Sequence, residues 1–148
     1  MKIDQAGLDF IVQFEGLKLT PYLDSIKKPT IGVGTIHYPD GTPVKMTDKP
    51  ITKEQALFYL QDHITKNVSP YLDKTFTNLT QNQYNALCSF VYNLGSGALD
   101  KSSLKKLILS NGTKDQIKAA FLKWDIAGGK VIQGLLSRRN KEATLFNL

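Results

Sequence analysis

Two acidic residues near the N-terminus, Glu15 and Asp24, have the chemistry that glycosidic bond cleavage requires. That reaction uses one carboxylic acid to protonate the leaving oxygen and a second carboxylate to activate water or to attack the sugar. Glu15 ends an apolar segment, whereas Asp24 lies in a polar segment after Pro21, so we expect the first to stay protonated and the second to be ionised. Taken alone, the pair is weak evidence, and the simpler interpretation is that Glu15 is a surface helix residue and Asp24 an ordinary turn residue.

Thr30 and the glycines that follow it extend the pattern to F-E-G, seven residues, D, five residues, T-I-G-V-G. In an extended strand, alternate side chains share a face. Ile31 and Val33 would then lie on one face, and the other face would carry Thr30, Gly32 and Gly34. We expect this second face to be nearly bare backbone, which lets a bulky ligand approach closely.

The element that must position Glu15 is a helix that ends at this residue. Leu8 and Ile11 follow the spacing of an amphipathic helix, Asp4 can cap its start, and Gly16 can end it. Glu15 then falls in the last turn, on the same face as the apolar stripe.

The segment after this helix is predicted to form short strands. Pro21 argues against further helix, and residues 27–29 and 40–41 are turn signals within residues 20–46. We therefore expect a small, three-stranded antiparallel sheet to carry Asp24 and Thr30.

The rest of the chain is predicted to be helical. Three capping-box signatures pair Thr52 with Gln55, Thr80 with Gln83, and Thr113 with Gln116. Helices are expected near 53–67, 81–93, 102–110, 114–124 and 135–146, with breaks at Pro70, Gly95 and Gly97, Gly112, and Gly128 with Gly129. The predicted fold is α+β and mainly helical: one domain over residues 1–148, with a small β-containing lobe at 15–50 and a helical lobe at 68–148 flanking a cleft.

Composition and charge narrow the class of protein. A chain of 148 residues fits one domain, and no stretch approaches the roughly 18 apolar residues of a membrane span or shows a signal peptide. The single cysteine, Cys88, cannot form an intramolecular disulfide.

The net charge of +6 lies entirely in residues 100–148, which contain ten Lys/Arg and four Asp/Glu. This excess suits an anionic partner (nucleic acid, acidic lipid or bacterial envelope), or it is a set of solvated helix faces.

With these residues in view, the sequence resembles the phage-type lysozymes, glycoside hydrolase family 24. That family spaces its Glu, Asp and Thr as Glu15, Asp24 and Thr30 are spaced here. The resemblance continues through Thr80, Gln81, Gln83, Ala86, Leu87, Ser89, Phe90, Asn93, Gly95, Gly97, Ser102, Ser103 and Leu104. It also includes Trp124, Gly128, Gly129, Lys130, Gly134, Leu135, Arg138, Arg139 and Glu142. It therefore covers almost the whole chain.

The resemblance implies a lysozyme-like fold and a muramidase that cuts the β-1,4 bond between N-acetylmuramic acid and N-acetylglucosamine. Glu15 would be the general acid, Asp24 would orient or activate the water, and Thr30 would help to hold that water, in a reaction that inverts the anomeric centre. Tyr92, Asn93 and Ser103 resemble positions that line the substrate side of the cleft. Alternatively, Tyr92 belongs to the core, and Asn93 and Ser103 cap neighbouring helix ends.

The sequence departs from the family at one point, because Thr35 stands where some members have a histidine after the second glycine. His37 and His63 have no Cys or second His at ligand spacing, so we expect neither a metal nor a cofactor. Arg138 either pairs with Glu142, the interpretation we favour, or faces the cleft, and Trp124 is expected in the core.

The implied partner is bacterial peptidoglycan, and we expect a monomer without stable membrane insertion. The resemblance further implies synthesis in the host cytoplasm and action on the cell wall or periplasm after release through a separate membrane pore, a phage holin. Two alternatives stay open: a wall-binding module that has lost catalysis, and a small basic nucleic-acid-binding protein. The second lacks interleaved aromatic residues or a recognition helix, so we expect no nucleic-acid partner.

Overall fold

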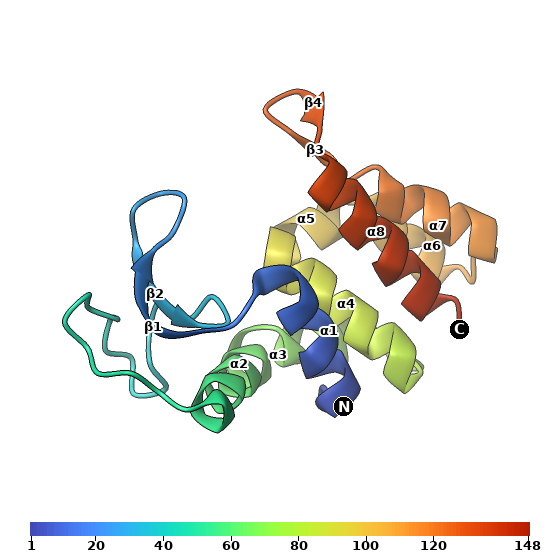
Figure 1. Ribbon diagram of the computed structural model, residues 1–148. Helices are drawn as coiled ribbons and strands as arrows, with labels where there is room; N and C mark the ends of the chain where they lie inside the picture. The colour runs from blue at the N-terminus through green and yellow to red at the C-terminus, as the bar shows by residue number, and fades with distance from the viewer.

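The computed structural model describes residues 1–148, in which a small lobe with two strands lies beside a larger helical lobe (Figure 1). The helices are α1 Gln5–Glu15, α2 Lys53–Asn67, α3 Ser69–Thr75, α4 Gln81–Leu94, α5 Ser96–Lys101, α6 Ser103–Leu109, α7 Lys114–Leu122 and α8 Gln133–Phe146. The strands are β1 Lys18–Leu23, β2 Pro29–Gly32, β3 Ile126–Ala127 and β4 Lys130–Val131. The predicted fold class, mainly helical α+β with a small antiparallel sheet, is confirmed.

Helix α1 begins and ends where its sequence predicts. The Asp4 carboxylate accepts a hydrogen bond from the Gly7 N–H at 2.9 Å, and Gly16 ends the helix with φ +78°. Leu8 and Ile11 are buried against the rest of the helical lobe. Glu15 is therefore the last residue of a firmly anchored helix, at the point where the chain leaves for the small lobe.

The small lobe holds a two-stranded sheet, so the prediction of three strands is wrong. Strand β1 pairs antiparallel with β2, with Tyr22 opposite Thr30. Beyond β2 there are only isolated bridges, Ile31 with Thr35 and His37 with Pro43. Extended structure stops at Gly32 because this residue has φ +67°, a left-handed conformation that turns the chain.

The same turn removes Gly32 from the predicted bare strand face open to a ligand. A Cβ on Gly32 would lie 3.2 Å from the Cβ of Ala56. Helix α2 therefore occupies the space beside this glycine, and the missing side chain allows the helix to pack closely.

The longer helices follow their predicted bounds more closely than the short elements do. All three predicted capping boxes form, at the starts of α2, α4 and α7. The sequence analysis missed α3, where Pro70 stands in the first turn and does not break a helix. It also missed α5, in a segment expected to be broken by Gly95 and Gly97, and the hairpin β3–β4 around Gly128 and Gly129.

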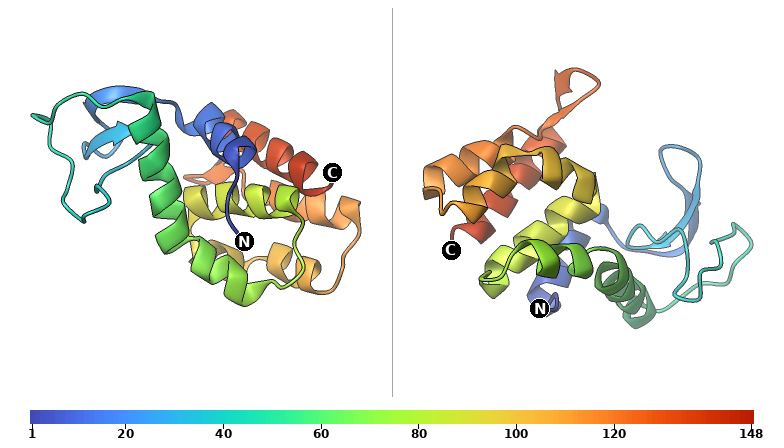
Figure 2. Two further views of the ribbon diagram at one scale, coloured as in Figure 1. Left: turned by 90° about the horizontal axis from the view of Figure 1, so that it is seen from below. Right: turned by 180° about the vertical axis from the view of Figure 1, so that it is seen from behind.

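Helix α4 lies at the centre of the helical lobe and is buried along most of its length, with α1 and α8 packed against it. Figure 2 shows α2 running from the small lobe to the helical lobe. The buried apolar residues form one cluster that extends from Ile3 in the N-terminal segment to Phe146 in α8, and Trp124 packs partly buried against it, as expected. No helix has both the length and the apolar character needed to cross a membrane.

Candidate active site

A pocket of about 330 Å³ lies where α1 ends. Its lining comes from α1, the loop after β2, α2 and the end of α4: Glu15, Gly34, Thr35, Ile36, His37, His63, Tyr92 and Asn93. Both lobes therefore contribute to it. A second pocket, of about 370 Å³, is lined by the end of α8 and the loops around α6 and contains none of the predicted site residues.

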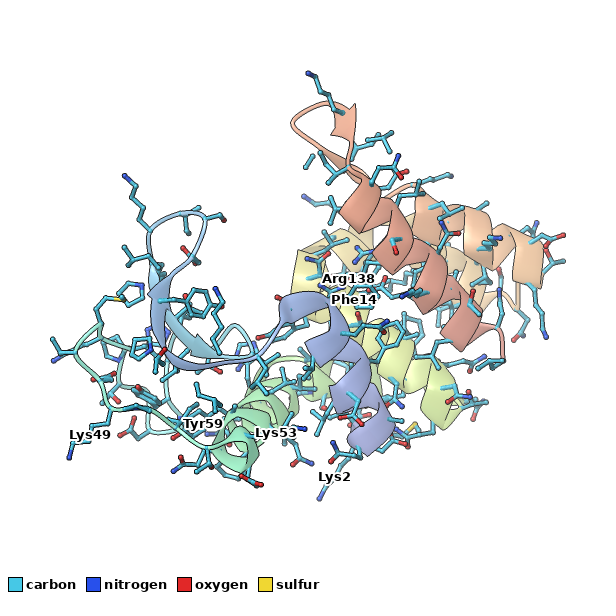
Figure 3. All side chains as sticks on the ribbon, viewed as in Figure 1. Lys2, Phe14, Lys49, Lys53, Tyr59 and Arg138 are labelled. Atoms are coloured by element: carbon cyan, nitrogen blue, oxygen red, sulfur yellow. The ribbon has the colours of Figure 1, made fainter.

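Glu15 is held in this pocket by one arginine. Arg138 Nη1 donates a hydrogen bond to Glu15 Oε1 at 2.6 Å. The Arg138 side chain is only 5% exposed and lies over the Phe14 ring, 5.2 Å from its centre, as the labelled side chains in Figure 3 show. The Glu15 carboxylate therefore meets a guanidinium, a charged neighbour that the sequence analysis, which considered only the apolar stripe of α1, did not predict.

Behind Arg138 lies a buried set of charges formed by Ser89, Arg138, Arg139 and Glu142, which we call the Arg–Glu network. Arg138 Nε lies 3.3 Å from Glu142 Oε1, and the Ser89 hydroxyl donates to the same oxygen at 2.7 Å. Arg139 Nε lies 2.9 Å from Glu142 Oε2. The favoured pairing of Arg138 with Glu142 is thus present; Arg138 also reaches Glu15, but it is not among the residues that line the pocket.

Burial governs the titration of this network. Burial raises the pKa of Glu142, and the nearby Arg139, Ser89 and Arg138 oppose that shift. Burial lowers the pKa of Arg139, and Glu142 opposes that shift. Opposite charges within hydrogen-bonding distance therefore offset only part of the cost of removing water from both groups.

Asp24 forms the turn between β1 and β2. Its Oδ1 accepts hydrogen bonds from the backbone N–H groups of Ile26 at 3.0 Å and Lys28 at 2.8 Å. Asp24 does not line the 330 Å³ pocket. It lies close enough to Tyr22 for its charge to affect the pKa of the phenol, as the charge of Glu15 also does. Burial, Glu15 and then Asp24 raise the pKa of Tyr22.

Thr30 lies across the sheet from Tyr22 and is buried. Its hydroxyl donates a hydrogen bond to the Lys28 carbonyl at 2.9 Å, in the same turn that Asp24 organises. Tyr22 therefore pairs with Thr30 and feels the charges of Glu15 and Asp24, and the sequence analysis overlooked it. Its position two residues before Asp24, near the end of β1, was the available signal.

Tyr92 and Asn93 both lie in the pocket lining. The Tyr92 hydroxyl donates to the Val33 carbonyl at 2.6 Å, so α4 is tied directly to the loop after β2. Burial and then Glu15 raise the pKa of Tyr92, and Arg138 opposes them. Asn93 Oδ1 accepts a hydrogen bond from Arg139 Nη2 at 2.7 Å, which leaves its amide nitrogen free.

Ser103 does not line this pocket, and it is not the helix cap. Ser102 is the N-cap of α6 and accepts from the Lys105 N–H at 3.3 Å, so the capping alternative belongs to the preceding serine. The Ser103 hydroxyl accepts a 3.4 Å hydrogen bond from Lys123 Nζ.

Two histidines that the sequence analysis set aside line the pocket. His37 comes from the loop after β2, and His63 packs edge-on against Tyr92 with the ring centres 5.5 Å apart. Burial lowers the pKa of His63, and Asp62 opposes that shift. No group of three or more His, Cys, Asp or Glu side chains is arranged to hold a metal ion.

Comparison with known proteins gives consistent matches. The family model described as phage lysozyme matches residues 12–142. The endolysin of Bacillus phage PZA is 40% identical over 149 residues, which cover 99% of this chain and 55% of that protein. The chain thus spans about half the length of this relative. The endolysin of Salmonella phage P22 is 36% identical, with 99% of this chain and 98% of that protein covered.

Among solved structures, the endolysin of Escherichia coli O157:H7 phage FAHEc1 superimposes with a TM-score of 0.88 at 39% identity. This match covers 99% of the present chain and 93% of the other. Sequence and fold similarity therefore extend over both lobes and over the pocket between them.

Proposed function

The chain belongs to the phage lysozyme family, and from this premise we propose that it is a muramidase that hydrolyses the glycan strands of bacterial peptidoglycan. The proposed target is the β-1,4 bond between N-acetylmuramic acid and N-acetylglucosamine. The observation that carries the proposal is the Glu15 carboxylate, exposed to a pocket between two lobes and held there by a buried arginine.

Glu15 is the proposed general acid. Arg138 occupies Oε1, so Oε2 is the oxygen that can carry a proton to the leaving group. Oε2 lies 3.7 Å from the position that a Cβ on Gly34 would take, so the absence of a side chain there gives a sugar room to reach the acid. Once the proton has left, the guanidinium stabilises the carboxylate that remains.

Asp24 and Thr30 are proposed to act on the attacking water. Asp24 Oδ1 is engaged by two backbone N–H groups, which leaves Oδ2 as an acceptor for a water proton. The Thr30 hydroxyl donates to Lys28, so its oxygen can accept a second hydrogen bond from the same water. A water attacking directly, without a covalent intermediate, would invert the anomeric centre.

The proposed substrate contacts divide by position. The free amide nitrogen of Asn93 and the ring of Tyr92 line the pocket and are available to a bound sugar. Ser103 lies outside the pocket, so it would meet only a substrate that extends along the helical lobe past Lys123.

The remaining inferences concern organisation and access. We infer one lysozyme domain over residues 1–148, with lobes at 15–50 and 68–148, that acts as a monomer without a cofactor. Peptidoglycan is the anionic partner that suits the net charge of +6. A holin pore would bring the protein from the host cytoplasm to the wall.

The test is the turbidity loss of purified peptidoglycan, with identification of the new sugar ends. The parent should release reducing ends at N-acetylmuramic acid, and Glu15→Gln should remove nearly all cleavage while the fold and wall binding persist. Glu54→Gln is the matched control, since Glu54 is exposed on α2 and the charge change is the same. Cleavage by Glu15→Gln at the parental rate would show that another group supplies the proton, and wall binding by a parent that does not cleave would favour a binding module.

The role of Asp24 has its own test. Asp24→Asn should slow cleavage strongly, because an amide is a poor acceptor for the water proton. Asp40→Asn is the control: Asp40 also bonds a backbone N–H in a turn of the small lobe, that of Thr42 at 2.9 Å. Equal rates for the two variants would assign Asp24 to the turn alone.

A further inference from the structure

The Arg–Glu network places three ionisable side chains, Arg138, Arg139 and Glu142, inside the helical lobe. Ser89, Arg139 and Glu142 are completely buried, and Arg138 is nearly so. Buried ion networks are costly to desolvate and are often no more stabilising than apolar residues of the same volume. Their position directly behind Glu15 points to a functional reason for keeping them.

The charges of the network balance only when Glu15 is included. Two guanidinium groups face the single carboxylate of Glu142, so the network has one positive charge in excess. Glu15, whose Oε1 lies 2.6 Å from Arg138 Nη1, is the carboxylate that neutralises this excess when it is ionised. Its protonation state is therefore coupled to the charges behind it.

We propose that Glu142 is a positioning residue that sets the pH at which Glu15 ionises, by sharing the Arg138 guanidinium with it. The inference deepens the proposed function, because it concerns the residue assigned there as proton donor. Glu142 is buried and does not line the pocket, so it acts only through Arg138.

The geometry gives each carboxylate a different part of the same guanidinium. Arg138 Nε faces Glu142 Oε1 at 3.3 Å, while Nη1 faces Glu15 Oε1. Nη2 donates to the Ser89 carbonyl at 3.2 Å, which fixes the plane of the group. With Glu142 ionised, Arg138 stabilises a Glu15 carboxylate less than an unshared arginine would, and the acid keeps its proton to a higher pH.

A change of charge at Glu142 should therefore move the titration of Glu15 measurably. Both carboxylates lie within hydrogen-bonding distance of the one Arg138 guanidinium, so at an effective dielectric constant of about 20 Coulomb's law gives a shift on the order of one pH unit. Replacing Glu142 by Gln retains an acceptor for Ser89 and removes the negative charge. Glu15 should then ionise about one pH unit lower.

Other titratable groups also surround Glu15 and must be separated from this effect. They come from every element packed around the pocket: Arg138 of α8, Tyr92 of α4, His63 of α2, Tyr22 of β1, Asp24 of the β1–β2 turn and His37 of the loop after β2. With so many titratable groups around the pocket, the readout must be the Glu15 carboxyl itself.

The chain allows this measurement because it contains only three glutamates: Glu15, Glu54 and Glu142. With glutamate labelled by ¹³C at the side-chain carboxyl, NMR should resolve three signals. In the parent, the Glu142 signal should show an inflection at the pH where Glu15 titrates, and the Glu54 signal should show none. If the Glu142 signal shows no inflection at that pH, the proposal is overturned without any variant.

Two variants then test the direction in which the titration midpoint of Glu15 moves. Glu142→Gln should lower the titration midpoint of Glu15, whereas Arg139→Gln, which removes a positive charge, should raise it. The double variant should return it toward the parental value and, because it leaves no unpaired buried charge, should fold better than either single variant. Glu54→Gln is the matched control and should leave the midpoint unchanged. Equal midpoints in Glu142→Gln and the parent would refute the proposal, and if neither single variant folds, the parental titration decides.

The pH profile of cleavage connects the network to catalysis. For an enzyme that uses protonated Glu15, the alkaline limb of the profile of Glu142→Gln should move down by the same interval as the NMR midpoint. If the NMR midpoint of Glu15 moves but the alkaline limb of the rate profile does not, Glu15 is not the proton donor, and the proposed function is contradicted. If the parent does not cleave peptidoglycan, the proposed function is contradicted as well. The NMR titration would still test the coupling between Glu142 and Glu15.

Discussion

Gly7→Ala should destabilise the protein, although alanine is the better helix former. Gly7 is buried in α1, where the helix that carries Glu15 lies against α4. A Cβ at this position would lie 2.6 Å from Asn85 Oδ1 and 2.6 Å from Ile3 Cγ1. Ile3 has room to adjust only if the N-terminal segment moves, and Asn85 is held in place by hydrogen bonds.

The magnitude follows from the opposing effects. In an open helix the change would stabilise by about 1 kcal/mol. Here Asn85 Nδ2 donates to Asp4 Oδ1 at 2.7 Å, and Gln81 donates to Asn85 Oδ1 at 3.0 Å. Overpacking costs about 1–3 kcal/mol, and disturbing these buried hydrogen bonds adds about 1 kcal/mol. We expect a net loss of about 2 kcal/mol.

Urea unfolding followed by circular dichroism would measure this loss. Gly134→Ala is the matched control, because Gly134 is an exposed helical glycine of α8 with nothing within 4 Å of an added Cβ. It should be neutral or stabilise by up to about 1 kcal/mol. If Gly7→Ala proved as stable as the parent, α1 and α4 would not be packed as closely as the structure shows, and the positioning of Glu15 by this contact would be refuted.

Three further outcomes are expected. Gly34→Ala forces an alanine to φ +74° and puts its Cβ 3.0 Å from the Tyr92 hydroxyl, so peptidoglycan cleavage should fall about tenfold, equivalent to about 1.4 kcal/mol. Gly41→Ala has φ +89° but no neighbour within 4 Å, and equal activity losses would show that backbone strain alone is responsible. Burial lowers the pKa of His63, so the contribution of the neutral imidazole to stability is present above about pH 6.5 and is lost as the pH falls. The unfolding free energy of the parent, relative to that of His63→Gln, should therefore decrease between pH 7.5 and 5. A constant difference would contradict this. Burial raises the pKa of the Cys88 thiol, so a thiol reagent at pH 8 should label it only after unfolding, and rapid labelling of the native protein would place it at the surface.

The sequence predicted best those features that local chemistry decides. Helix α1 starts at Asp4 and ends at Gly16, and α2 has its predicted bounds, because capping groups and apolar spacing lie within a few residues of the ends they determine. Pro70 was misjudged because a proline that interrupts one helix can also start the next.

The third strand was overpredicted because two residues, Gly32 and Gly34, adopt positive φ. A glycine tolerates both an extended strand and a left-handed turn, so its presence does not choose between them. Contact with Ala56 of α2, which lies far along the chain, favours the turn.

For the candidate site, the sequence by itself identified the family and predicted Glu15, Asp24 and Thr30 as its site residues, because their types and spacing are local. Only the tertiary structure placed Arg138 on Glu15, across 123 positions of sequence, and Tyr22 near enough to Glu15 for the charge of that acid to raise its pKa. The surroundings of a carboxyl depend on which distant groups folding brings within a few ångströms of it. The sequence analysis therefore expected an apolar neighbour for Glu15, whereas the packing of α8 against α4 supplies a buried guanidinium.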